Sequence, residues 1–103
     1  MAQYNPPLRD MQFVLHELLN VTDELRLLPK HADIDADTIN AVLEEGGKFA
    51  TEVLFPLNVS GDAEGCTLNP TTHEVTTPKG FKEAYRQYID GGWAALGCDP
   101  EYG

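Results

Sequence analysis

With 103 residues, the chain has room for one domain with a single modest core and little room for a large cofactor cleft. Its 17 acidic and 7 basic residues give a formal net charge of −10, which opposes binding to nucleic acid and to anionic lipid surfaces. Hydrophobic residues make up 42% of the sequence, so the acidity does not indicate disorder and we expect a folded domain.

The first predicted helix begins near Asp10, which is a suitable capping residue. Its apolar residues recur at i, i+3, i+4, i+7 and i+8, a pattern that predicts one face against a core. These residues are Met11, Val14, Leu15, Leu18 and Leu19. His16 and Glu17 have no catalytic neighbour in the sequence, so we expect them at a solvated or edge position. A short amphipathic stretch over residues 21–28 follows and should end before Pro29.

A second, longer helix is predicted to begin near Asp35 or Asp37. Its apolar stripe consists of Ile39, Val42, Leu43, Phe49, Ala50, Val53 and Leu54. Gly46 and Gly47 interrupt the pattern. Since each glycine costs roughly 1 kcal/mol relative to alanine in a helix interior, the pair predicts close helix packing or a local bend. Pro56 is expected to end or kink the helix.

The start of the second helix also fits the D-x-D-x-D skeleton of a calcium loop of the EF-hand type. The matching residues are Asp33, Asp35, Asp37 and Glu44. Two positions depart from that loop, because Thr38 replaces the glycine of the sharp turn and Asn40 replaces an aliphatic residue. Acidic residues are also favoured at the positive end of a helix dipole. We therefore favour helix capping over calcium binding.

Residues 58–76 are rich in Gly, Asn, Asp, Ser and Thr, which predicts a loop with strand-like pieces. Two of these pieces flank an Asn-Pro pair, so a minor β-hairpin is expected near residues 66–76. The segment Gly61–Cys66 brings two carboxylates and a thiol together. It contains no histidine or second thiol to activate Cys66, so we prefer a structural loop to a nucleophile or metal site. His73 is expected to face solvent.

A third helix is predicted after Thr77 as its cap, with Pro78 at its first position. Its apolar stripe consists of Phe81, Ala84, Tyr85, Tyr88 and Ile89. Together with Trp93, this stripe could form a surface on which a ring cofactor stacks, but helical spacing is more typical of a core face. Gly91 and Gly92 should end the helix by adopting left-handed backbone angles.

These elements predict an all-α domain over residues 1–103, similar to an up-down bundle, with three main helices and the minor hairpin. No segment approaches the roughly 20 apolar residues that span a bilayer, and no secretory signal is recognised, so we expect a cytoplasmic protein. Cys66 and Cys98 are expected to be buried or half-buried free thiols, with a disulfide as the alternative. The scattered histidines do not form a zinc site, which needs about four ligands.

Three blocks of the sequence resemble, in the same order, the N-terminal domain of flavin-dependent acyl-CoA dehydrogenases. The similarity is to the branch that includes the methylmercaptopropionyl-CoA enzymes. The blocks are YNPPLRDMQFVLHELL, KFATEVLFPLNVSGDAEGC and VTTPKGFKEAYRQYIDGGWAALGCDPEYG. The resemblance implies an all-helical domain, truncated before the flavin-binding and catalytic domains. It would pack against a central β domain and a C-terminal helical domain, or self-associate where these are missing.

In that family, a glutamate of the C-terminal domain removes the α proton of the acyl-CoA, and FAD accepts a hydride from the β carbon. The resemblance places no catalytic base, flavin ligand or metal ligand on this sequence. We therefore expect FAD and acyl-CoA only in a complete enzyme. A family loop near the acyl-binding region resembles the segment from Asp99, which makes Tyr102 and Gly103 the candidate substrate-side residues. The alternative is a stand-alone acidic helical module that binds a protein partner.

Overall fold

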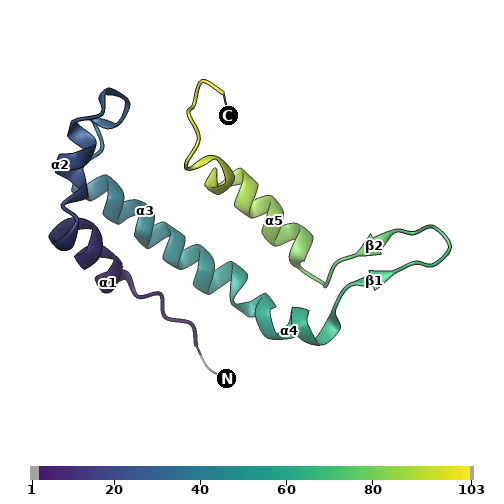
Figure 1. Cartoon of the computed structure of the whole chain (residues 1–103). Coiled ribbons are helices and arrows are strands. Elements are labelled where there is room, and N and C mark those ends of the chain that lie inside the picture. Colours follow the sequence, from purple (N-terminus) through teal and green to yellow (C-terminus); the bar gives the residue numbers. More distant parts are fainter. Residues whose placement is uncertain (1–2, 103) are drawn as a thin grey trace. The chain divides into compact units, whose positions relative to one another are not determined.

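A computed structural model describes residues 3–102, and it is predominantly helical with one small two-stranded sheet (Figure 1). This confirms the predicted fold class. The chain divides into two compact units, Met1–Glu52 and Val53–Gly103. None of the helices within residues 3–102 is both long and apolar enough to cross a membrane.

The first unit is built from helical segments. They are α1 (Leu8–Gln12), the π-helical η1 (Phe13–Leu18), α2 (Val21–Arg26), the 3-10 turn η2 (Pro29–His31) and α3 (Ala36–Phe49). The prediction that Asp10 caps the first helix is wrong, because the helix begins at Leu8 directly after Pro7. Asp10 lies in the first turn, where its carboxylate still interacts favourably with the helix dipole. The short helix predicted over residues 21–28 is confirmed as α2.

Helix α3 begins where the sequence indicates. The Asp35 side chain accepts a hydrogen bond from the Thr38 N–H at 2.8 Å, which satisfies one of the free amides of the first turn. The helix continues through both glycines, and it passes into the π-helical η3 (Ala50–Leu54). A Cβ on the buried Gly47 would lie 3.1 Å from Pro6 Cγ and 3.4 Å from a Leu8 methyl. The predicted close packing is therefore confirmed at Gly47.

The second unit contains two helices, a hairpin and a final turn. They are α4 (Pro56–Glu64), β1 (Thr67–Leu68), β2 (Val75–Thr76), α5 (Phe81–Asp90) and the 3-10 turn η4 (Trp93–Ala95). The loop predicted from residue 58 is wrong over residues 58–64, which are helical. Pro56 starts α4 at its first position, where a missing N–H costs nothing. Gly61 lies inside this helix despite its low helix propensity, because it contacts α5.

The hairpin is confirmed. Strands β1 and β2 are antiparallel, with Thr67 opposite Thr76 and Leu68 opposite Val75. The turn between them is stabilised by Asn69, whose side-chain oxygen accepts hydrogen bonds from two successive backbone N–H groups at 2.9 and 3.2 Å. This is the local bonding by which asparagine favours turns.

The ends of α5 differ from the prediction in part. The helix starts after Gly80, which has a left-handed φ of 91°, so Thr77 does not cap it. Pro78 is buried, and its carbonyl accepts a hydrogen bond from the Phe81 N–H at 3.2 Å. At the other end, Gly92 has the expected left-handed φ of 80°, whereas Gly91 remains right-handed at −76°.

Candidate functional site

An apolar groove lies between α4 and α5 in the second unit and has a volume of about 350 Å³. It is lined by Leu54, Leu57, Asn58, Phe81, Ala84, Tyr85 and Tyr88. Two glycines allow the close approach of the surrounding segments. A Cβ on Gly61 would lie 2.6 Å from the Phe81 ring, and one on Gly80 would lie 2.7 Å from a Leu57 methyl. These contacts bring Phe81 and Leu57, two of the lining residues, close to the backbone.

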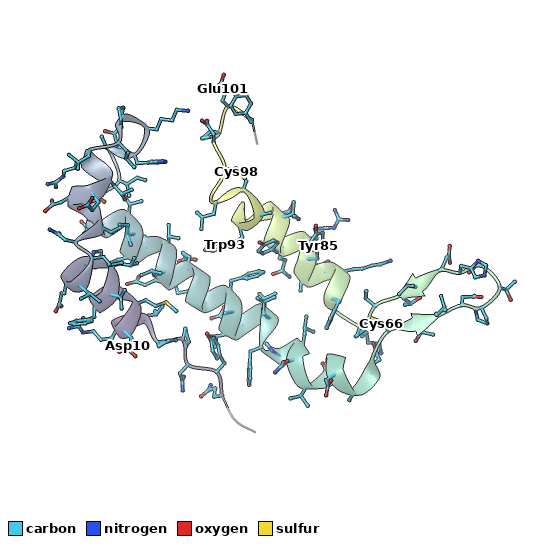
Figure 2. All side chains as sticks on the ribbon, viewed as in Figure 1. Asp10, Cys66, Tyr85, Trp93, Cys98 and Glu101 are labelled. Atoms are coloured by element: carbon cyan, nitrogen blue, oxygen red, sulfur yellow. The ribbon has the colours of Figure 1, made fainter. Side chains whose placement is uncertain are left out.

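The aromatic side chains of α5 are exposed, contrary to the prediction of a buried core face. Phe81 is 38% exposed, Tyr88 37% and Tyr85 66%, and Ala84 is the one buried hydrophobic side chain among the described residues. The rings of Tyr85 and Tyr88 stack with their centroids 6.3 Å apart. Figure 2 labels Tyr85 on α5. These residues share one face of α5, as predicted, but the second unit supplies too little surface to cover this face.

A second hollow, of about 440 Å³, lies along α5 and shares Tyr85 with the groove. Its lining consists of Lys82, Glu83, Tyr85, Arg86, Ile89 and Asp90. Tyr85 lines both the hollow and the groove, so the apolar surface runs without interruption into a charged one. The i, i+4 spacing of Lys82 and Arg86 is visible in the sequence, but the position of these cations beside exposed apolar side chains was not predicted.

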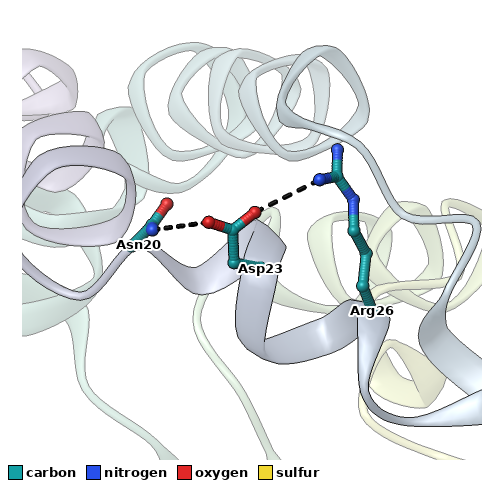
Figure 3. Close-up of polar contacts among 3 residues, drawn as sticks. All are labelled: Asn20, Asp23 and Arg26. Carbon is teal, nitrogen blue, oxygen red and sulfur yellow. Dashed lines mark hydrogen bonds and ion pairs between the residues drawn. The ribbon is translucent and has the colours of Figure 1, made fainter.

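The first unit has a polar cleft of about 440 Å³. Its lining residues are His16, Asn20, Thr22, Asp23, Arg26, Asp35, Ala36 and Asp37. Figure 3 shows Asp23 accepting hydrogen bonds from Asn20 Nδ2 at 2.7 Å and from Arg26 Nη1 at 3.2 Å. Because both carboxylate oxygens of Asp23 already have donors, this side of the cleft is internally satisfied.

Among the residues of the candidate calcium loop, Asp35 caps α3 and Asp37 lies in its first turn. The backbone hydrogen bond from Thr38 lowers the pKa of Asp35, as expected for a carboxylate that accepts at a helix N-terminus. Among residues 3–102, His, Cys, Asp and Glu side chains form no group of three or more with a metal-holding arrangement. The capping role of Asp35 is thus confirmed by its geometry.

His16 lies at an edge position, as predicted. It is half-buried, and its Nε2 lies 2.7 Å from Asn40 Oδ1 on α3. This hydrogen bond joins η1 to α3 within the first unit. The arrangement accounts for His16 as a structural residue.

Most of the segment that contains the candidate thiol Cys66 is helical. Gly61, Asp62 and Glu64 belong to α4, so the structural loop predicted there is wrong over this stretch. The Glu64 carboxylate accepts a hydrogen bond from the Lys79 N–H and so ties the end of α4 to the segment before α5. Cys66 is an exposed free thiol.

The remaining candidates lie towards the end of the chain. Cys98 is likewise an exposed free thiol, so the prediction of buried or half-buried cysteines is wrong for both (Figure 2). Tyr102 is 83% exposed, and its N–H donates to the Asp99 carbonyl at 3.0 Å. Gly103 lies outside the described residues. The substrate-side role of these two residues stays a prediction. His73 in the hairpin turn is exposed, as expected.

The apolar groove does not fit a flavin dinucleotide. Its lining offers one amide and two phenols but no cationic side chain to face a diphosphate. In the first turn of α4, Pro56 has no N–H and the Asn58 N–H already donates to the Phe55 carbonyl at 3.0 Å. The lining of the groove therefore offers little that would hold the diphosphate of a flavin dinucleotide.

No protein-family model matches the sequence. Curated proteins do match it. The chain is 37% identical over 100 residues, or 97% of its length, to the 3-methylmercaptopropionyl-CoA dehydrogenase of Ruegeria pomeroyi. It is 31% identical over its full length to the broad-specificity linear acyl-CoA dehydrogenase FadE5 of Mycobacterium tuberculosis, and 31% over 86 residues to the butyryl-CoA dehydrogenase of Syntrophomonas wolfei. The chain spans only 16%, 17% and 14% of these relatives, respectively.

Proposed function

We infer that this chain, which is similar to acyl-CoA dehydrogenases over nearly its whole length, is the N-terminal helical domain of such an enzyme. The proposed parent reaction is the FAD-dependent α,β-dehydrogenation of an acyl-CoA thioester. Residues 1–103 would form one domain that packs against the remaining domains and shapes the acyl pocket. In this proposal, the flavin site and the catalytic base lie on other parts of the enzyme.

The similarity over nearly the whole chain is the observation that carries this proposal. The structure adds a physical reason for a packing role. Apolar side chains at helical spacing remain exposed on α5, and an exposed apolar face normally marks a surface that another protein surface covers.

Three finer assignments belong to the proposal. Tyr102 and Gly103 would form part of the wall of the acyl pocket, which is consistent with the exposure of the Tyr102 side chain. FAD would bind to the complete enzyme. The compartment would be the cytoplasm, where thiols such as those of Cys66 and Cys98 stay reduced.

A domain exchange tests the assignment. The corresponding segment of the Ruegeria pomeroyi dehydrogenase is replaced by these 103 residues, and flavin absorbance and acyl-CoA-dependent reduction of an artificial acceptor are recorded. The hybrid should bind flavin and turn over, whereas the same enzyme without the segment should not. The 103-residue chain alone should show neither flavin absorbance nor turnover.

Two outcomes would contradict the proposal. One is bound flavin with turnover by the 103-residue chain alone, because the proposal assigns those tasks to other domains. The other is a hybrid without flavin while a hybrid carrying the Mycobacterium tuberculosis FadE5 segment retains it, because both segments have the same proposed role.

The second candidate function is a stand-alone acidic module that binds a protein partner. Its supporting observation is the exposed apolar surface of the described residues, which includes Leu18, Leu27 and Tyr85. Under either function, exposed apolar faces should make the isolated chain self-associate. Light scattering should show a mass that rises with concentration, and a strictly monomeric mass at high micromolar concentration would argue against both interpretations.

A further inference from the structure

We draw no further inference here: the strongest candidate, the exposed apolar face of α5 together with the groove between α4 and α5, carries none, because nothing in the structure shows what covers that face.

Discussion

Gly61 is the position where the structure makes the sharpest quantitative prediction. It lies inside α4, where a methyl group would approach Cε1 and Cζ of the Phe81 ring to 2.6 Å. In the isolated helix, Gly61→Ala should stabilise by about 0.5–1 kcal/mol, because alanine loses less backbone entropy than glycine on folding. In the folded chain, the methyl group forces the Phe81 ring to move.

The two effects have opposite signs, and their sizes decide the outcome. Overpacking in a close-packed contact costs about 1–3 kcal/mol. Phe81 is 38% exposed, so its ring has some freedom to move and the cost should fall in the lower half of that range. After the gain in helix propensity, the expected net effect is a loss of up to about 1.5 kcal/mol of unfolding free energy.

A double-mutant cycle with Phe81→Leu isolates the contact. Leucine lacks the Cε1 and Cζ atoms of the Phe81 ring. The Cδ1 atom of that ring lies 3.8 Å from a Cβ built on Gly61, which is an ordinary van der Waals contact. Gly61→Ala should therefore stabilise in the Phe81→Leu background by about 0.5–1 kcal/mol, which gives a coupling energy of about 1–2 kcal/mol. Unfolding in urea is followed by circular dichroism at each corner of the cycle.

Ser60→Ala provides the matched control. Ser60 is the exposed neighbour of Gly61 on α4, so this change should stabilise by a few tenths of a kcal/mol in both backgrounds. Stabilisation by Gly61→Ala of the same size with and without the Phe81 ring would refute the reasoning. In that case the ring would not restrict this position.

Further predictions concern backbone conformation and helix capping. Gly80→Ala should destabilise the chain more than Gly92→Ala. Both changes replace a left-handed glycine, at a cost of about 1–2 kcal/mol, but a Cβ at Gly80 would also lie 2.7 Å from a Leu57 methyl, whereas one at Gly92 would meet nothing within 4 Å. Equal losses of unfolding free energy in urea would show that the Leu57 contact relaxes freely. Asp35→Ala should lower the unfolding free energy, whereas Asp35→Asn should retain most of the cap, and an equal loss for both would contradict the hydrogen bond to Thr38. The hydrogen bond from Thr38 lowers the pKa of Asp35 in the folded state. The stabilising contribution of Asp35 should therefore be complete above the ordinary carboxyl pKa and be lost as the pH falls through the lowered folded-state pKa. Urea unfolding from neutral to acidic pH should show this loss of unfolding free energy in the wild-type chain and less of it in Asp35→Asn.

Local signals in the sequence identified several features of the candidate surfaces. The apolar stripe of α5, the glycine at its end and the asparagine of the hairpin turn each act over a few residues, so they are visible without a structure. The exposure of the aromatic side chains was not visible, because spacing reveals that residues share a face and not what covers it.

The sequence by itself determined the helical class, the cap at Asp35, the hairpin and the family resemblance, because each depends on local patterns or on similarity along the chain. Only the tertiary structure decided that Gly61 sits inside a helix and that Gly80 takes the place of Thr77 as the cap. In both cases a contact with a distant side chain, Phe81 or Leu57, leaves no room for a Cβ. Local propensity disfavours glycine inside a helix, and it is overridden where close packing between segments requires the smallest residue.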